Sequence, residues 1–261
     1  MKKLILLTAV ILLSATTFVQ AQDGELTGTV DVTYMSQYIW RGYNLYGNQS
    51  TIQPSIDLDL YGTGLGLNVI WKRANTSGFE VDEELDFTLS YSNTLYEYET
   101  YATNYTVGWM YYNFPDGPWT PQGPCIDMQE FFATLSWPEI CPEGVVPSYT
   151  VIKLSNVEEY SPINEVSGFL HILGLGYDLP VEGLLPEIPE QILHLSVAMV
   201  YNDGVLEADH DWSHAVFGVT TDFDLGNDCT FTPGVYYQSS MDDSVNPSDE
   251  FWASVGVSYA F

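Results

Sequence analysis

The sequence predicts an all-β fold: a closed antiparallel transmembrane β-barrel of about 12 strands. Apolar and polar side chains alternate in segment after segment, short and long connections alternate, and the chain ends on the apolar strand "SVGVSYAF". A period of two gives each strand one apolar and one polar face. A membrane barrel turns the apolar face toward lipid, whereas a soluble barrel or sandwich turns it inward. The connections and the C-terminus favour the membrane barrel.

The first element is an export signal. Two lysines precede an apolar run from Leu4 to about Leu13, and Val19-Gln20-Ala21 supplies small residues at a cleavage site. The apolar run is shorter than the roughly 20 residues that a membrane-spanning helix needs. We therefore expect a secretory signal peptide over residues 1–21 and the barrel domain over residues 22–261.

After cleavage, the chain has 35 acidic residues and only four basic ones, which are Arg41, Lys72, Arg73 and Lys153. This composition leaves no basic patch and excludes nucleic acid as a partner. The three cysteines, Cys125, Cys141 and Cys229, match no zinc or redox spacing. The predicted topology brings no two of them together, so we expect no disulfide.

The strands follow in order along the chain. Alternation is clear in 29–34, 55–60, 65–71, 85–91, 105–111, 167–179, 191–202, 212–224, 229–238 and 250–261, and weaker near 126–137 and 148–154. Long polar connections are expected at 41–51, 72–83, 115–124, 155–165, 203–211 and 239–250. If the chain starts in the periplasm, all of these lie on the outer side, as in bacterial barrels. The connections "PEICPEGVVP" and "LPVEGLLPEIPEQ" are long for the inner side and speak against this assignment.

The last strand carries a pattern of its own. Gly256, Tyr259 and Phe261 are similar to the Gly-x-x-Φ-x-Φ ending by which outer-membrane barrel precursors are recognised. The barrel assembly machinery of the outer membrane is therefore an expected partner. A buried C-terminal strand of a soluble protein is the alternative interpretation.

The alternation of the first strand predicts the position of Arg41. With alternation kept in phase to residue 41, Tyr38 and Trp40 are expected at the outer lipid interface and Arg41 at the outer mouth, facing inward. The same phase places Lys72 inside near the rim and four carboxylates in the lumen: Asp31, Asp57, Asp59 and Asp86. Our hypothesis is that Arg41 pairs with interior or loop carboxylates and pins the first loop. The alternative is a solvated rim charge worth less than about 1 kcal/mol.

The segment "SQYIWRGYNLYG" and the following "QPS" carry a family resemblance, through Ser36, Tyr38, Trp40, Arg41, Gly42 and Gln53-Pro54-Ser55. The chain resembles the Gcw_chp family of bacterial proteins of unknown function, also labelled TorF-like, over about residues 27–91. The resemblance implies an outer-membrane barrel. It implies no substrate, cofactor or catalytic residue.

The segment "ADHDWSH" supplies weak metal-ligand candidates, Asp209, His210, Asp211 and His214. In an extended chain the two histidines lie about 13 Å apart, too far for one ion unless the loop folds back. A solvated loop is the simpler interpretation. No nucleophile, phosphate-loop or dinucleotide motif is present, so we expect neither an enzyme nor a cofactor or metal site.

These observations predict a small pore or structural barrel in the bacterial outer membrane, in contact with lipid and lipopolysaccharide. Interior carboxylates favour cations, so a small solute or ion is the expected cargo. Two alternatives remain open. One is a surface protein that binds through its long aromatic, acidic loops, and the other is a secreted soluble β protein.

Overall fold

The computed structural model describes residues 24–261 except 118, 121–122, 125–126, 158–165 and 184–188. The expected signal peptide and Cys125 lie outside the described residues. The two helices within the described ranges are three-residue 3-10 turns, η1 (Glu80–Asp82) and η2 (Val205–Glu207). None of the described helices is long and apolar enough to cross a membrane.

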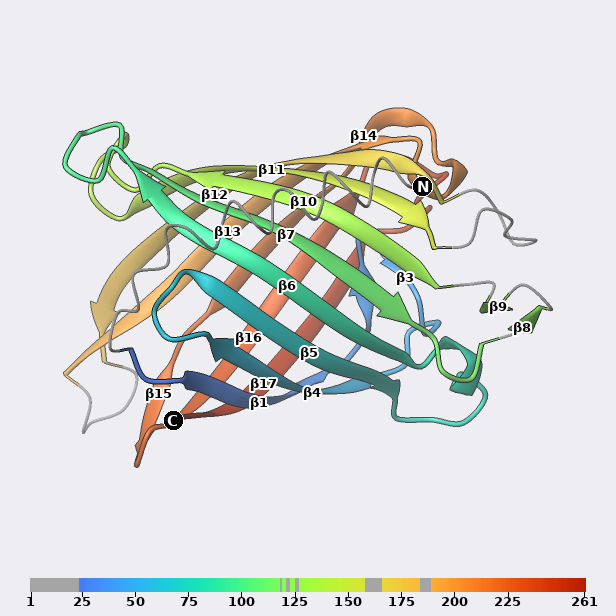
Figure 1. The fold of residues 1–261 in the computed structure, drawn as a ribbon, viewed down its shortest axis with the longest axis horizontal. Coiled ribbons are helices and arrows are strands. Elements are labelled where there is room, and N and C mark those ends of the chain that lie inside the picture. The colour runs from blue at the N-terminus through green and yellow to red at the C-terminus, as the bar shows by residue number, and fades with distance from the viewer. Residues whose placement is uncertain (1–23, 118, 121–122, 125–126, 158–165, 184–188) are drawn as a thin grey trace.

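Twelve antiparallel strands form a closed ring (Figure 1). Each pairs with its neighbours in sequence, and the ring closes where β1 pairs with β17 and β14 pairs with β16. The predicted closed barrel is therefore confirmed. Its strands are β1 (Thr27–Met35), β4 (Thr51–Asp59), β5 (Leu65–Ala74), β6 (Glu84–Leu95), β7 (Thr103–Asn113), β10 (Met128–Ser136), β11 (Val145–Asn156), β12 (Gly168–Glu182), β13 (Glu190–Asp203), β14 (His210–Thr220), β16 (Cys229–Ser240) and β17 (Glu250–Ala260).

Five short strands lie outside the ring or extend it. The pairs β2 (Ile39–Trp40) with β3 (Tyr43–Asn44) and β8 (Trp119–Thr120) with β9 (Gly123–Pro124) form separate hairpins. The strand β15 (Phe223–Gly226) pairs with the start of β16. The β2–β3 hairpin belongs to the first long connection and becomes the centre of the candidate site.

The two ends of the barrel differ (Figure 1). We call the end where β1 begins and β17 finishes the terminal end; its connections are 60–64, 96–102, 137–144, 183–189 and 221–228. We call the opposite end the loop end; its connections are 36–50, 75–83, 114–127, 157–167, 204–209 and 241–249. In Figure 1 the loop end lies at the right.

The apolar face of the strands points outward. Val32 is 43% exposed and Phe87 37%, whereas the neighbouring Asp86 is fully buried. The same holds around the ring, where exposed apolar residues include Val30, Leu65, Leu89, Val107, Phe131, Phe169, Leu173, Phe217, Val235, Phe251, Val255 and Val257. Exposed apolar surface on this scale is costly in water and favourable in lipid.

The expectation for Tyr38 and Trp40 is wrong. The first strand ends at Met35, five residues earlier than the continuous alternation suggested. The chain then turns into the barrel, and both rings are buried, at 4% and 9% exposure. Alternation cannot report this turn, because a hairpin folded inward keeps the same local period of two.

Candidate functional site: the lumen plug

Residues 36–50, which we call the plug, fold from the loop end into the lumen. Strands β2 and β3 pair through Ile39 with Asn44 and Trp40 with Tyr43. The two residues between them, Arg41 and Gly42, have positive φ of 51° and 96°. Positive φ at both central positions defines a type I′ turn, the tight connection that matches the twist of a hairpin. Arg41 thus occupies a backbone conformation that few non-glycine residues adopt.

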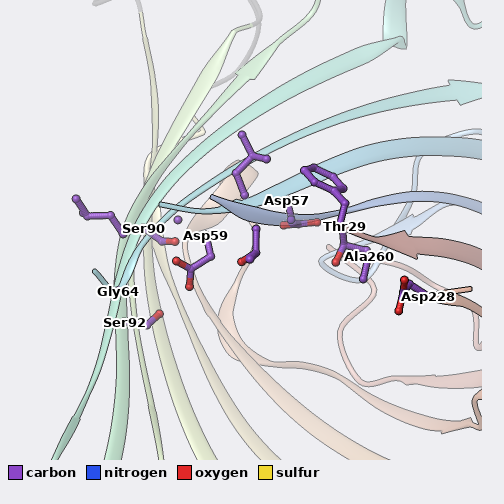
Figure 2. A pocket seen from close by; sticks show the side chains of 14 residues that line it. Thr29, Asp57, Asp59, Gly64, Ser90, Ser92, Asp228 and Ala260 are labelled. Carbon is purple, nitrogen blue, oxygen red and sulfur yellow. The ribbon is translucent and has the colours of Figure 1, made fainter. Parts of the chain in front are cut away.

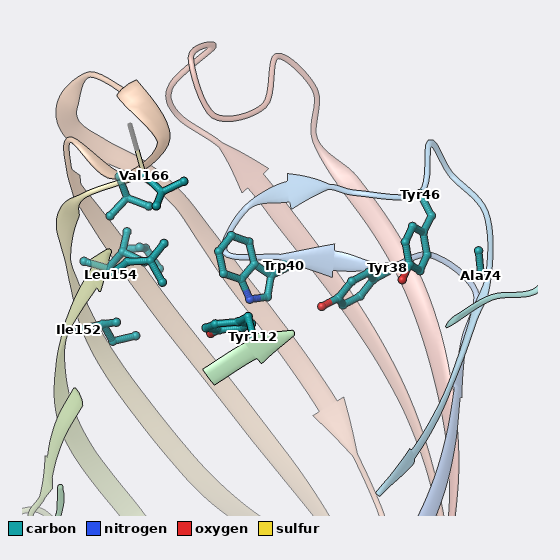
Figure 3. Packing of buried hydrophobic residues seen from close by; sticks show 11 residues of the cluster. Tyr38, Trp40, Tyr46, Ala74, Tyr112, Ile152, Leu154 and Val166 are labelled. Atoms are coloured by element: carbon teal, nitrogen blue, oxygen red, sulfur yellow. The ribbon is translucent and has the colours of Figure 1, made fainter. Parts of the chain in front are cut away.

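The plug buries an aromatic face against the barrel wall (Figure 3). The Trp40 ring meets Tyr112 edge to face, with centroids 5.8 Å apart, and Tyr38 packs on Tyr46 at 5.0 Å. Across the lumen the wall is apolar, and Ile152, Leu154, Leu170 and Val200 belong to the same buried cluster. Such aromatic contacts contribute about 0.5–1.5 kcal/mol each beyond their buried area.

The tip of the plug is held through the carbonyl oxygen of Gly42. Gln238 donates to it from β16 at 2.9 Å, and Asn246 donates from the connection before β17 at 3.1 Å. A Cβ atom at Gly42 would lie 2.7 Å from His214 Nδ1 and from Val245 Cγ1. A Cβ atom essentially never lies this close to another heavy atom, so a side chain at this position would force the plug tip or its neighbours to shift.

Arg41 reaches the opposite wall. Its guanidinium donates to both carboxylate oxygens of Glu130 on β10, at 3.2 and 3.3 Å, and Tyr112 donates to the same carboxylate at 2.7 Å. The Glu130 side chain is 3% exposed and that of Arg41 24%. Breaking a buried, hydrogen-bonded ion pair costs about 3–5 kcal/mol, because the remaining charge stays desolvated.

Lys72 forms a second buried ion cluster, next to Tyr38 of the plug. Its ammonium lies 2.6 Å from Glu84 Oε1 and 2.6 Å from Asp86 Oδ2, both on β6. It also lies over the Tyr38 ring of the plug and the Tyr112 ring of the wall, at 5.6 and 5.7 Å. Arg41 and Lys72, the inward-facing cations of the described residues, are therefore both paired with carboxylates in the loop half of the lumen.

Three further contacts tie the plug to the loops and to the start of β17. The Tyr43 hydroxyl donates to the Val205 carbonyl at 3.3 Å, Asn44 donates to Glu250 at 3.1 Å, and Tyr46 donates to the Asp82 carbonyl at 3.1 Å. Burial raises the pKa of Tyr43 to about 12. Both the Tyr43 and Tyr46 phenols accordingly stay neutral donors well beyond physiological pH, since burial also raises the pKa of Tyr46.

The terminal half of the lumen is different (Figure 2). It holds an open pocket of about 750 Å³, and its polar lining includes Thr29, Asp57, Asp59, Ser90, Ser92 and Asp228. Asn68 donates to Asp57 at 2.8 Å, and the Asp59 carboxylate accepts from the Gly62 backbone at 2.6 Å.

Within the described residues, no carboxylate of the terminal half forms an ion pair with Lys or Arg. Asp31 accepts a hydrogen bond from Thr33 at 2.8 Å. His194 lies 2.7 Å from Asp178 and 3.5 Å from Asp222. The structure therefore places Asp31, Asp57 and Asp59 in the open half and Asp86 in the plugged half.

The four metal-ligand candidates are not brought together. His210 is 70% exposed and lies 2.5 Å from Asp203, whereas His214 is buried in the lumen beside Gly42. Asp209 lies directly before β14 and Asp211 is its second residue, and both are exposed. Within the described residues no group of three or more His, Cys, Asp or Glu side chains could hold a metal ion.

The C-terminal strand forms the seam of the barrel. The Phe261 backbone N–H donates to the Gly28 carbonyl at 2.9 Å, and Gly28 returns a bond of the same length to Phe261. Tyr259 and Phe261 point outward, at 48% and 47% exposure, and Gly256 pairs with Thr33. Cys141 and Cys229 are free thiols.

Sequence reasoning missed the residues that receive the plug. Glu130, His214, Gln238 and Asn246 lie between 89 and 204 positions from Arg41 and Gly42 along the chain. One signal was available: Glu130 interrupts the apolar stretch "MQEFFATL" at an inward-facing position of its strand. A lone carboxylate there indicates a buried partner.

Solved structures with the same fold are outer-membrane porins and channels. The KdgM porin matches with a TM-score of 0.52 and 11% identity, covering 89% of this chain and 99% of that one. The NanC porin matches with 0.52 and 10%, over 89% and 98%. The COG4313 outer membrane channel from Pseudomonas putida F1 matches with 0.50 and 11%, over 92% and 96%. At these identities the likeness concerns the fold alone.

The sequence comparisons carry the family assignment. No functionally curated protein matches the chain. The Gcw_chp family, described as "Bacterial protein of unknown function", matches residues 20–152, a stretch that begins before β1 and contains the whole plug and its Glu130 partner. The chain therefore belongs to the Gcw_chp family.

Proposed function

We propose that the protein is a small cation-favouring pore of the bacterial outer membrane, obstructed at its loop end by the plug. The observation that carries the proposal is the contrast between a plugged, charge-paired loop half and an open terminal half whose carboxylates form no ion pair with Lys or Arg within the described residues. Export by the signal peptide, insertion by the barrel assembly machinery and contact with lipopolysaccharide belong to the same proposal. It includes no enzymatic activity.

The charges of the lumen support cations as the cargo. Arg41 and Lys72 are already paired with carboxylates, and the other two basic residues of the mature chain, Arg73 and Lys153, lie outside the lumen, where they stack on Trp71 and Phe169. The remaining lumen field is negative, which attracts cations and repels anions. One of the similar structures is the KdgM porin in complex with oligogalacturonate. An anionic oligomer of that kind is a poor cargo for this lumen.

The outward apolar band supports a membrane barrel over a secreted soluble protein. Large apolar side chains at 40% exposure or more occur on β1, β5, β6, β7, β10, β12, β13, β14, β16 and β17. Membrane fractionation with heat-modifiable gel mobility tests this point. We expect the chain in the outer-membrane fraction and a faster band before boiling. Recovery in detergent-free periplasmic extracts would rule out the membrane barrel.

Ion selectivity tests the cargo. In planar bilayers with a salt gradient, we expect a reversal potential that favours the cation. The double substitution Asp57→Asn and Asp59→Asn should reduce that preference, because it removes two lumen charges without changing side-chain shape. Asp243→Asn, in the exposed connection before β17, is the matched control and should change little. An anion preference of the unmodified protein would refute the proposal.

A further inference from the structure

A second cavity lies at the loop end, apart from the carboxylate-lined pocket of the terminal half. It has a volume of about 360 Å³, within the range of small-molecule sites. The plug contributes one wall through Trp40, Leu45 and Tyr46, and the loops contribute Phe114, Val166 and Leu206. An apolar, ring-lined cavity of this size suits the apolar part of a small organic molecule.

The charged residues that line the cavity have one sign, and Asn156 is a further polar lining residue without charge. Asp82 and Glu84 both line the cavity, but Glu84 is already paired with Lys72 at 2.6 Å. The hydrogen bonds and ion pairs of the described residues give the Asp82 carboxylate no partner, since its bond to Tyr46 uses the backbone carbonyl. Partial burial raises the pKa of Asp82, because removal of water disfavours the charged carboxylate. Charge complementarity therefore excludes an anionic occupant and favours a cationic one.

We propose that the loop-end cavity binds a small apolar molecule that carries one primary ammonium group, such as an arylalkylamine. The apolar part packs against Trp40, Phe114 and Leu206, and the ammonium donates to Asp82. The ring of Trp40 adds a surface that attracts cations. A fatty acid or an acidic sugar fits the volume but places its carboxylate against Asp82.

Binding has a consequence for the plug. Because Trp40, Leu45 and Tyr46 form one wall, the site is complete only when the plug is seated. A ligand that binds one of two conformations shifts the population toward it. The amine therefore holds the plug in the lumen and closes the pore. The proposed binding depends only on the seated plug, whereas the proposed effect on conductance also depends on the protein being a pore.

Calorimetric titration of the purified full-length chain in lipid nanodiscs tests the binding. The probes share one ring and one linker: phenethylamine, phenylacetate and 2-phenylethanol. We expect saturable binding of phenethylamine at one site per chain and at least about tenfold weaker binding of the other two. Equal affinity for the three probes, or no saturable binding, would overturn the inference.

Two variants locate the site. Asp82→Asn should weaken phenethylamine binding about tenfold, whereas the control Asp243→Asn should leave it unchanged. Heat-modifiable gel mobility verifies that both variants fold, and an equal loss in both would count against the cavity. If phenethylamine binds but the protein conducts no ions, the cavity stands and the pore fails. If the protein conducts but phenethylamine does not bind, the cavity fails and the pore stands.

Discussion

The loop half and the terminal half of the lumen are built from the same strands but filled in different ways. In the loop half, inward positions carry large or charged side chains such as Tyr112, Glu130 and Ile152, and these enclose the plug. In the terminal half, small or hydroxylated residues such as Gly66, Ser90 and Ser92 line the open pocket together with carboxylates such as Asp57 and Asp59. The difference shows that strand number sets the width of a barrel, whereas the inward side chains decide whether that width is open.

The two halves also treat charge differently. The loop half holds Arg41 and Lys72 in direct contact with Glu130, Glu84 and Asp86, whose side chains are at most 3% exposed. The terminal half leaves its carboxylates to solvent and to hydroxyl or amide donors, as with Asp57 and Asn68. The cations therefore anchor the plug, and the free carboxylates govern which ions enter.

The largest expected effect comes from erasing the difference between the halves. Replacement of residues 37–49 by a short Gly-Ser linker removes the plug but leaves every ladder bond of β1 and β4 in place. We expect the unit conductance in planar bilayers to rise several-fold, because the lumen is then open at both ends. Heat-modifiable mobility serves as the folding control. Unchanged conductance in a folded variant would mean that the plug does not limit flow.

A smaller change adds a single methyl group at the tip of the plug. Gly42→Ala introduces a Cβ that meets His214 and Val245 at 2.7 Å, so the hairpin tip or these two side chains must shift. Gly78→Ala is the matched control, since Gly78 has a similar φ of 100° but nothing within 4 Å of the added atom. Channel recordings should show more frequent opening for Gly42→Ala than for Gly78→Ala. Identical recordings would contradict the seat described for Gly42.

The anchor of the plug is tested next. Arg41→Met leaves Glu130 buried without its cation, and we expect a loss of about 3–5 kcal/mol in the stability of the plugged form. The double variant Arg41→Met with Glu130→Leu should recover part of this loss, because no charge remains desolvated. Arg73→Met, which removes an exposed ion pair with Glu83, should cost less than about 1 kcal/mol. The open fraction in channel recordings measures all three.

The smallest expected effect concerns alkaline pH. Because the pKa of Tyr43 is raised from 10.0 to about 12 in the folded plug, the stability from its neutral phenol is complete below pH 10. It is lost as the pH rises through about 12. We expect the open fraction to increase within this window. The Tyr43→Phe variant has no phenol to ionise, so its open fraction should begin to increase at a higher pH. An unchanged dependence of the open fraction on pH would show that Tyr43 does not cause the increase.

Much of the fold could be predicted because it depends on local patterns. Alternation identified the strands, and the connection lengths separated the loop end from the terminal end. Both features belong to single strands and their neighbours. The inward phase of Lys72 and Asp86 followed from the same rule, since parity along a strand decides the face.

The plug could not be predicted in the same way. Tyr38 and Trp40 continue the period of the first strand, so nothing local marks the point where the chain leaves the wall. Their burial depends on a cavity whose walls come from β7, β11 and β12. The pairing of Arg41 with Glu130 likewise joins residues 89 positions apart. Long-range contacts of this kind follow from the closed ring and not from the pattern of any segment.

Sidedness of access tests the contrast between the two halves most directly. In a background with Cys125, Cys141 and Cys229 replaced by Ser, Ser90→Cys places one thiol in the open half of the lumen. A bulky charged thiol reagent, added to one side of a planar bilayer, should modify this thiol rapidly from the terminal end and slowly from the loop end. Removal of the plug should make the two rates similar. Equal rates from both sides with the plug in place would contradict the account.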